Sequence, residues 1–327
     1  MKILVTGAAG FIGFHLTRRL AAEGHSVVAL DNLNDYYAVA LKQARLERLG
    51  KVPFVRLDIA DLDALDALFA RERFTHVMHL AAQAGVRYSV SHPHQYGHSN
   101  LTGFLNLLDV CQRHAVEHLL YASSSSVYGR QQRLPFCESD PVDTPASLYA
   151  ATKRANEMMA YSYADLHRLP ATGLRFFTVY GPWGRPDMAP CLFAERLLRG
   201  DPIAVFNHGR MARDFTYIDD IVESLVRLLP HAPAGDTGAP HALYNVGRGD
   251  PVALLDFIDT LESALGARAP RDFQPMQPGD IERTWADTTR LRETTGHVPQ
   301  VPLETGIERF AAWYREQRPL MQRVMGD

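Results

Sequence analysis

The sequence has few cysteines and no long hydrophobic run. Its three cysteines among 327 residues, Cys111, Cys137 and Cys191, are odd in number and widely separated. Such a set fits neither a disulfide framework nor a zinc site with paired ligands, so we expect no metal and a reducing, cytoplasmic location. No apolar stretch reaches about 18 residues, and no signal-peptide order follows Met1, so we expect neither export nor a membrane span.

Long blocks of one charge sign are also absent. The 34 basic and 37 acidic residues give a formal net charge of −3. Because a nucleic-acid binder needs a basic stripe, we expect no nucleic-acid partner. Hydrophobic residues make up 46% of the chain and charged residues 22%, which is typical of a globular protein and excludes disorder as the main state.

Short apolar runs alternate with longer amphipathic stretches through the first part of the chain, a pattern typical of a parallel sheet with helices on both faces. We therefore predict an α/β fold with a doubly wound parallel (Rossmann) sheet and a smaller C-terminal α/β substrate-binding lobe. The expected strands run from Lys2 to Thr6, Ser26 to Leu30, Phe54 to Leu57, His76 to Leu80, His118 to Ala122 and Thr172 to Phe177. The expected helices run from Phe11 to Glu23, Asp61 to Arg71, Tyr96 to His114 and Ser147 to Leu169.

The pattern loosens beyond Gly181, where prolines interrupt shorter elements. We expect residues 1–180 to form a dinucleotide-binding domain that carries the catalytic residues. Residues 181–327 should form mainly the substrate lobe, with some segments returning to the first domain. Helical segments are expected from Leu192 to Leu198 and from Ile218 to Leu229, and residues 230–240 should form a surface loop.

Three glycines follow the first expected strand and open the first expected helix. Gly7, Gly10 and Gly13 are spaced G-x-x-G-x-x-G, where the backbone must turn tightly and a helix N-terminus can face a pyrophosphate. Asp31 ends the second strand, and its carboxylate can accept hydrogen bonds from both hydroxyls of an adenosine ribose while repelling a 2′-phosphate. We interpret this as an NAD site. The alternatives are a purely structural turn and an Asp31 that caps a loop.

Asp58 ends the third expected strand. It could reach the adenine of the dinucleotide, or it could belong to the start of the helix that follows. The sequence leaves both interpretations open.

Tyr149 and Lys153 are four residues apart on an expected helix and therefore share one face. A free tyrosine titrates near pH 10, so it becomes a useful base only when a cation such as Lys153 stabilises its phenolate. The alternative is a chance pair on a helix surface. Upstream, the run Ser123 to Ser126 lies where open α/β sheets bind ligands. Those hydroxyls could face Tyr149, or they could form an ordinary polar loop.

The motifs together resemble a known family. The segments T-G-x-x-G-F-I-G, H-L-A-A-Q-A-G-V-R, S-S-S-S-V-Y-G, Y-x-x-x-K and R-F-F-T-V-Y-G-P-x-G-R-P-D-M are similar to those of the extended short-chain dehydrogenase/reductases. Within that family the UDP-glucuronate 4-epimerases match best. Residues 209–220 and 277–280 fit as well, so the resemblance spans almost the whole chain.

The resemblance implies that Ser124, Tyr149 and Lys153 form the catalytic set, with Ser126 assisting. Dehydratases and decarboxylases that resemble this chain carry an acidic residue in the corresponding loop, whereas this serine run has none. Neutral hydroxyls favour simple oxidation and reduction at one carbon. Tyr149 would take the C4 hydroxyl proton while hydride passes to NAD, and hydride would return to the opposite face after the 4-keto sugar rotates.

The family also implies binding residues. The NAD contacts transfer to Gly7, Gly10, Phe11, Ile12, Gly13, Asp31, Asn32, Asp58, Ile59, Leu80, Ala81, Ala82, Gln83, Tyr149, Lys153 and Phe176. The UDP-sugar contacts transfer to Arg87, Ser125, Ser126, Thr178, Arg185, Val205, Asn207, Arg213 and Asp280. Arg213 would lie near the diphosphate, Asp280 on the uridine ribose, and the backbone of residues 205–207 along the uracil.

Each charged substrate residue has a structural alternative. Arg213 could pair with Asp214, and Asp280 could hold its own loop. Arg185 lies in a proline-stiffened loop beside the expected sugar site, where its guanidinium could hold a uronate carboxylate or pair with Asp187.

Other functions share part of this pattern. A neutral UDP-glucose or UDP-N-acetylhexosamine 4-epimerase would need no cation at C6, so Arg185 discriminates against it. A UDP-glucuronate decarboxylase or a non-catalytic NAD-sensing scaffold is a further alternative, and Tyr149 with Lys153 argues against the scaffold. The resemblance also implies a homodimer built on the expected helices at 96–114 and 147–169.

Overall fold

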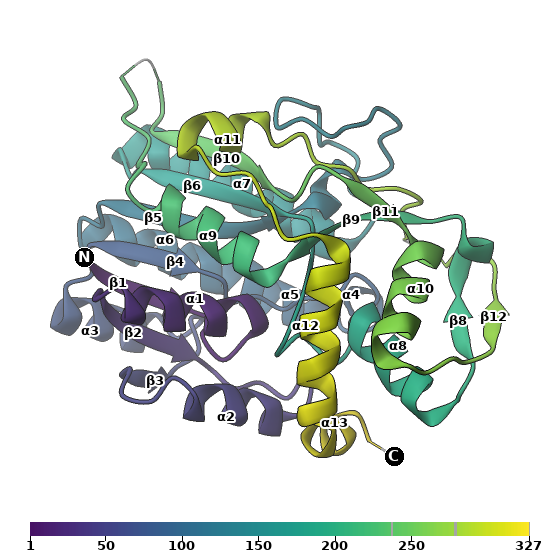
Figure 1. Ribbon diagram of the computed structural model, residues 1–327. Coiled ribbons are helices and arrows are strands. Elements are labelled where there is room, and N and C mark those ends of the chain that lie inside the picture. Colours follow the sequence, from purple (N-terminus) through teal and green to yellow (C-terminus); the bar gives the residue numbers. More distant parts are fainter. Residues whose placement is uncertain (237, 278–279, 327) are drawn as a thin grey trace.

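The computed structural model describes residues 1–236, 238–277 and 280–326. Seven parallel strands form the central sheet in the order β10-β6-β5-β4-β1-β2-β3 (Figure 1). They are β1 (Lys2–Thr6), β2 (Ser26–Asp31), β3 (Phe54–Arg56), β4 (His76–His79), β5 (His118–Ser124), β6 (Ala171–Phe176) and β10 (His241–Val246). This order reverses between β1 and β4, so the predicted doubly wound α/β fold is confirmed.

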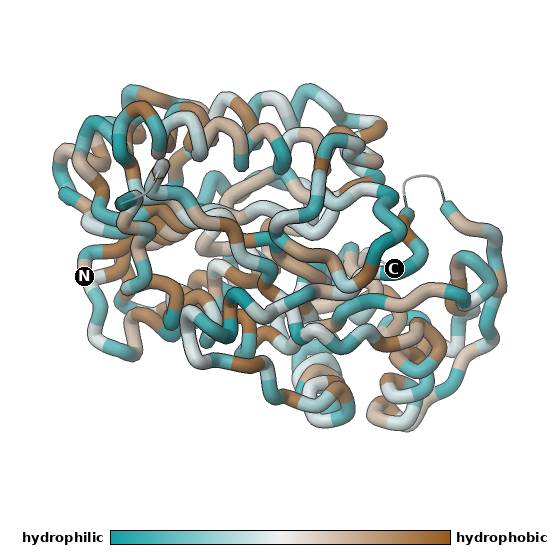
Figure 2. Tube along the Cα trace, turned by 90° about the horizontal axis from the view of Figure 1, so that it is seen from above, coloured by the Kyte–Doolittle hydropathy of each residue, from teal (hydrophilic) through white to brown (hydrophobic). Residues whose placement is uncertain are grey.

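Helices cover both faces of the sheet, as the apolar strands require. One face carries α1 (Phe11–Ala22), α9 (Ile218–Leu228) and α11 (Thr289–Thr295), and the other carries α3 (Leu62–Glu72), α6 (Gly103–Arg113) and α7 (Leu148–His167). Figure 2 shows these two helical layers on either side of the strands. Because side chains alternate along a strand, Ile3 and Val5 join one hydrophobic cluster and Leu4 joins the other.

The six expected strands are present, and the largest difference is at β5, which ends at Ser124 rather than Ala122. Among the elements that were not predicted are α2 (Val39–Glu47) and β10. The expected helix from Tyr96 to His114 is divided into α5 (Pro93–Tyr96), a π-helical segment η1 (Gly97–Thr102) and α6. A short α4 (Tyr88–Ser91) precedes it.

The smaller lobe lies at the carboxyl ends of the strands (Figure 1). A three-stranded sheet has the order β11-β9-β7, and β12 pairs with β8. These strands are β7 (Thr178–Tyr180), β8 (Ile203–Val205), β9 (Ala212–Tyr217), β11 (Pro251–Ala253) and β12 (Arg271–Phe273). The lobe also contains α8 (Ala189–Arg199), α10 (Leu254–Leu265), α12 (Leu303–Glu316), α13 (Arg318–Met325) and the short turn η3 (Phe206–Gly209). The short turn η2 (Ser125–Tyr128) directly follows β5 of the large sheet.

Segments from the second half of the chain complete the large sheet layer. β10 pairs with β6 along its whole length, from His241 with Ala171 to Val246 with Phe176. α9 packs against α1. The chain therefore passes between the large sheet layer and the smaller lobe more than once, and both parts border the cleft between them. Within the part of the chain that the structure describes, no helix is long and apolar enough to cross a membrane.

Candidate functional site

One cavity of about 940 Å³ lies at the carboxyl edge of the sheet, against the smaller lobe. Its walls include every residue that we expected to contact the dinucleotide: Gly7, Gly10, Phe11, Ile12, Gly13, Asp31, Asn32, Asp58, Ile59, Leu80, Ala81, Ala82, Gln83, Tyr149, Lys153 and Phe176. It is also lined by the expected substrate residues Arg87, Ser125, Ser126, Thr178, Arg185, Arg213 and Asp280. Val205 and Asn207 do not line it, although their neighbours Ala204 and Phe206 do.

The glycine turn leaves no room for side chains. A Cβ on Gly7, whose φ is 70°, would lie 2.7 Å from the Ala81 nitrogen, and a Cβ on Gly13 would overlap the Gly7 carbonyl oxygen. Gly10 begins α1 without a side-chain cap, and the first turn carries no acidic residue. The free amides at the positive end of this helix therefore suit a phosphate group, which is the part of a dinucleotide expected here.

Asp31 holds the backbone on both sides of this turn. Its Oδ2 accepts a hydrogen bond from Ala9 N at 3.1 Å, and its Oδ1 accepts one from Leu33 N at 2.8 Å. The loop-capping alternative is thus observed, but each carboxylate oxygen has a second lone pair that a ribose hydroxyl could use. The residues present fit NAD.

Asp58 does not cap the helix that follows it. The N-cap of α3 is Asp61, whose side chain accepts a hydrogen bond from Ala64 N. Asp58 instead accepts hydrogen bonds from Ala60 N at 2.9 Å and Asn32 Nδ2 at 3.0 Å. Burial raises the pKa of the Asp58 carboxyl, but these hydrogen bonds bring that pKa below its usual range. Asp58 is therefore a carboxylate in the cavity wall, beside Asn32.

Tyr149 and Lys153 lie on the first turns of α7, which begins at the N-cap Ser147. The Lys153 ammonium donates to the Ala122 carbonyl oxygen at 2.8 Å, and burial lowers its pKa to about 8. Burial raises the pKa of Tyr149, whereas a hydrogen bond with Ser124 and the charge of Arg185 oppose that rise. Tyr149 is therefore a neutral phenol near pH 7 in the protein alone, and Lys153 gives up its proton more readily than a free lysine does.

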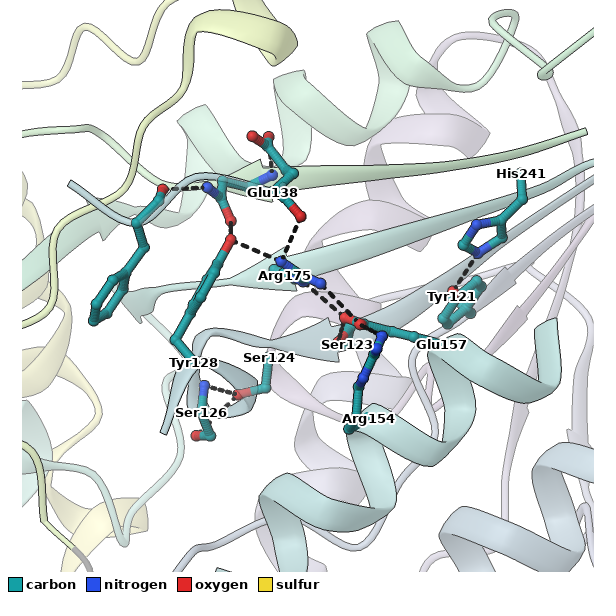
Figure 3. Close-up of polar contacts among 12 residues, drawn as sticks. Tyr121, Ser123, Ser124, Ser126, Tyr128, Glu138, Arg154, Glu157, Arg175 and His241 are labelled. Atoms are coloured by element: carbon teal, nitrogen blue, oxygen red, sulfur yellow. Dashed lines mark hydrogen bonds and ion pairs between the residues drawn. The ribbon is translucent and has the colours of Figure 1, made fainter. Parts of the chain in front are cut away.

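The serine run divides into two parts. Ser123 lines the cavity, but its hydroxyl donates to Glu157 Oε1 at 2.6 Å. Ser124 Oγ lies 3.1 Å from Ser126 Oγ and accepts a hydrogen bond from Ser126 N, as Figure 3 shows. Ser124, Ser125 and Ser126 line the cavity, so their hydroxyls reach the same space as Tyr149.

A buried ion pair lies behind the serines (Figure 3). Glu157 on α7 receives two hydrogen bonds from Arg175 on β6, at 2.8 and 2.9 Å, and both side chains are 1% exposed. Arg175 also donates to Tyr128 Oη, which donates to Asn245 on β10. The sequence analysis did not identify this network, although Tyr149, Lys153 and Glu157 recur every fourth residue.

Arg185 forms the ion pair with Asp187 that we considered as its alternative. Its Nε and Nη2 donate to the two carboxylate oxygens of Asp187, at 3.0 and 2.5 Å. Tyr36 donates to the same carboxylate at 2.9 Å, and its ring lies 5.7 Å from the Arg185 guanidinium carbon. All three residues line the cavity. The Arg185 side chain is 22% exposed and lines the cavity, so part of its guanidinium is accessible to a ligand.

The remaining charged residues meet at the mouth of the cavity. Arg87 Nη2 lies 3.2 Å from Asp280 Oδ2, and the guanidinium of Arg87 also faces the ring of Phe206. Arg213 donates to the carbonyl oxygens of Ala212 and Glu282 rather than pairing with Asp214. Asp214 is fully buried and is held by backbone amides of other segments. The surface-pairing alternative for Arg213 is therefore wrong.

Among the described residues, the Asp280 carboxylate pairs with Arg87, which belongs to a different segment of the chain. Pro278 and Gly279, which belong to the same expected segment, lie outside the described residues. Val205 is buried, and Asn207 Nδ2 donates to Arg210 O in a turn of positive φ. These two residues shape the segment beside the cavity.

Several cavity residues were not predicted, including Tyr36, Met188, Phe193 and Thr284, and Asp187 was considered only as a partner of Arg185. They come from loops and from the smaller lobe, where no periodic pattern marks them. Among the described residues, no group of three His, Cys, Asp or Glu side chains could hold a metal ion.

Comparisons with known proteins match this arrangement. A probable UDP-glucuronate 4-epimerase from Rhizobium meliloti is 46% identical over 331 residues, covering 96% of this chain and 97% of that protein. The crystal structure of a Bacillus cereus UDP-glucuronic acid 4-epimerase with UDP-glucuronic acid and NAD is similar with a TM-score of 0.89 and 33% identity, over 97% of this chain and 99% of that one. The crystal structure of a Thermotoga maritima UDP-glucose 4-epimerase with UDP-glucose is similar with a TM-score of 0.87 and 30% identity, over 97% of this chain and 100% of that one.

Residues 3–247 match the sequence model of the "NAD dependent epimerase/dehydratase family". This range includes the glycine turn, the serines, Tyr149, Lys153 and Arg185. The chain belongs to the NAD-dependent epimerase/dehydratase family.

Proposed function

We propose that this protein interconverts UDP-glucuronate and UDP-galacturonate by epimerisation at C4 of the sugar. The observation that carries the proposal is the convergence of Tyr149, Ser124 and Arg185 on one cavity. Tyr149 and Ser124 can move the proton of a C4 hydroxyl, and Arg185 can hold a C6 carboxylate. NAD bound along the glycine turn supplies a hydride acceptor and then a hydride donor. The relatives named for this activity support the proposal.

The chain's own residues handle the proton. Tyr149 as phenolate accepts the C4 hydroxyl proton, and the Ser124 hydroxyl, hydrogen-bonded to Tyr149, shares it. Lys153 stabilises the phenolate by its positive charge. Once the 4-keto sugar has rotated in the site, Tyr149 returns the proton to the C4 oxygen. Ser125 and Ser126 offer hydroxyls alone, so the serine loop provides no acid or base for elimination.

The substrate would extend from Tyr149 toward the smaller lobe. Arg185 and Thr178 would contact the uronate ring, with Ser125 and Ser126 on the other side. Arg213 would bind the diphosphate, since a guanidinium suits phosphate oxygens. Asp280 would accept a hydrogen bond from the uridine ribose, and for this the Arg87–Asp280 pair would open or shift. The backbone near Val205 and Asn207 would run along the uracil.

One experiment tests the reaction. Purified protein, supplied with NAD, is incubated with UDP-glucuronate, and the anomeric proton signals are followed by NMR. We expect a UDP-galacturonate signal that approaches the same ratio when the reaction starts from either sugar. Conversion of UDP-glucose alone would favour a neutral 4-epimerase, a UDP-pentose as main product would favour a decarboxylase, and no conversion would favour an NAD-binding scaffold.

We further propose that the protein is a homodimer in the cytoplasm. The dimer is supported by apolar side chains that face solvent on the packed helices α6 and α7, including Leu105 at 45% and Met158 at 60% exposure. The cytoplasmic location is supported by three free cysteines, which a reducing compartment would preserve.

A further inference from the structure

Arg45 on α2 is a fully buried arginine whose five N–H donors are all used. Nη1 donates to the Ala9 carbonyl oxygen at 2.8 Å and to Tyr37 Oη at 2.7 Å. Nε donates to the Trp183 carbonyl oxygen at 3.2 Å, and Nη2 donates to those of Trp183 and Gly184, at 2.7 and 3.2 Å. A buried guanidinium usually has a carboxylate partner, but all of these acceptors are neutral oxygens. The side chain therefore acts as a connector between backbone segments.

The two segments that Arg45 connects carry the two halves of the proposed complex. Ala9 lies in the glycine turn, between Gly7 and Gly10. The Gly184 carbonyl belongs to the peptide group that joins Gly184 to Arg185. One rigid, planar side chain thus fixes the backbone of Arg185 relative to the turn that would hold the dinucleotide phosphates.

The Arg185 loop needs such support, because it contains a strained residue. Trp183 has a φ of 62°, in the left-handed region that a bulky side chain rarely adopts. Its carbonyl accepts both hydrogen bonds from Arg45, and its ring is buried beside Trp313 and beneath Arg48. The preceding carbonyl, of Pro182, is hydrogen-bonded to His15 on α1. The loop conformation is therefore imposed by its neighbours.

We infer that Arg45 is a positioning residue that sets where Arg185 meets the sugar carboxylate relative to the bound dinucleotide. The inference rests on the proposed function. Arg45 lines no part of the cavity itself and acts through the loop at 183–185. Its loss should therefore alter the handling of the uronate carboxylate while the proton-transfer residues Tyr149 and Ser124 stay in place.

The test uses the NAD-loaded protein and three variants. Arg45→Met removes all five donors, and Arg45→Lys keeps the charge but cannot reach both segments with one ammonium group. Arg48→Met is the matched control, because Arg48 packs on the Trp183 ring and donates only to its own helix, at Ala44. If Arg45→Met does not fold, Arg45→Lys is compared with the wild type and Arg48→Met instead.

Two measurements are made. Hydrogen exchange of the amides of Gly184, Arg185, Asp187 and Met188 should be about tenfold faster in the Arg45 variants than in wild type or Arg48→Met, because several hydrogen bonds to the loop are lost. With UDP-glucuronate, the Arg45 variants should release a larger UDP-pentose share, which is also the result that we expect for Arg185→Ala. A purely structural role would not change this share.

Wild-type exchange in Arg45→Lys would overturn the inference. Faster exchange with an unchanged product share and unchanged uronate kinetics would also overturn it, since the loop would then be held without any effect on the carboxylate. If the wild type itself did not convert UDP-glucuronate, the proposed function would fail. The exchange rates would still show whether Arg45 holds the loop.

Discussion

Tyr149 is the residue whose loss should stop the reaction. Tyr149→Phe removes the proton acceptor but keeps the ring, so kcat should fall by about 10² to 10⁴ while NAD and UDP-sugar binding stay near wild type. In the wild type, kcat should rise with pH up to about pH 8, because the phenolate fraction of Tyr149 grows as its raised pKa is approached. Above about pH 8 kcat should level off, because Lys153 loses its charge as the phenolate fraction of Tyr149 grows. Steady-state kinetics and calorimetry measure both. A Phe variant with wild-type kcat would mean that another group is the base.

Asp31 should select NAD over NADP, because a 2′-phosphate would lie against a buried carboxylate that is 6% exposed. Asp31→Asn keeps an acceptor oxygen for Ala9 N or Leu33 N but removes the charge. We therefore expect this variant to bind NADP about tenfold to a hundredfold more tightly, relative to NAD, than the wild type does. Calorimetric titration with both cofactors measures the ratio. Equal binding of the two by the wild type would contradict this role of Asp31.

Arg185 should both select the acid and protect it. The 4-keto form of a uronic acid is a β-keto acid, which loses carbon dioxide when its carboxylate bond aligns with the carbonyl π system. A guanidinium held by Asp187 and Tyr36 can grip the carboxylate and prevent that alignment. Arg185→Ala or Arg185→His should weaken UDP-glucuronate turnover and raise the share of UDP-pentose.

A neutral UDP-hexose, if the enzyme accepts it, serves as the control for Arg185, because its turnover should suffer less in the same variants. Product analysis by NMR distinguishes these outcomes. Unchanged uronate kinetics without a by-product would remove the role of Arg185 and strengthen the neutral-sugar alternative.

At the scale of elements, the Glu157–Arg175 pair fastens α7 to the sheet beneath Tyr149. Glu157→Gln leaves Arg175 buried without its full partner, so the free energy of unfolding should fall by about 3 to 5 kcal/mol. Glu23, in an exposed pair with Arg19, offers a control, and Glu23→Gln should cost at most about 1 kcal/mol. Urea unfolding followed by circular dichroism measures both. Equal losses in the two variants would contradict the fastening role.

The pH dependence of this pair has a definite sign. Burial raises the pKa of Glu157, but Arg175 and Ser123 hold it below its ordinary value. Its stabilisation is therefore complete above the unfolded pKa and is lost as pH falls through the lower folded pKa. Stability of the Gln variant should change less than that of the wild type over this acid range.

Some elements could be predicted from the sequence and others could not. The buried strands β1 and β2 contain apolar runs, from Ile3 to Val5 and from Val27 to Leu30, and the glycines mark where the first strand ends. β10 pairs with β6 only because a chain segment returns from the smaller lobe, and no local pattern records that pairing. α2 has two buried cations, Lys42 and Arg45, on the face that a sequence pattern would assign to solvent.

At the scale of the whole molecule, the site is assembled from both halves of the chain. The sheet edge supplies residues that motifs identify, such as Asp31 and Tyr149. The loops supply the contacts that spacing cannot predict: Tyr36 reaches Asp187, and Arg87 reaches Asp280. Two residues that are more than 150 positions apart, such as Arg87 and Asp280, leave no periodic signal in the sequence. The residue types therefore indicated which groups could bind or react, but only the fold shows which of them contact one another.

Two molecules of the protein should assemble through the exposed apolar side chains of α6 and α7. Leu105 on α6 and Met158 and Tyr161 on α7 are 45%, 60% and 54% exposed, and an isolated chain would leave this apolar surface in water. Light scattering at micromolar concentration should give twice the mass of one chain. The double variant Leu105→Glu and Met158→Glu should give a monomer, because each buried carboxylate would lack a partner.

Phe273→Glu provides the matched control for the dimer, because Phe273 is an exposed apolar residue on β12 of the smaller lobe, at 50% exposure. It should leave the mass doubled. A wild-type monomer would contradict the dimer outright, whereas a dimer that both variants preserve would place the interface on another surface. If only the control variant disrupted the dimer, the interface would lie on the smaller lobe, near the mouth of the cavity, rather than on α6 and α7.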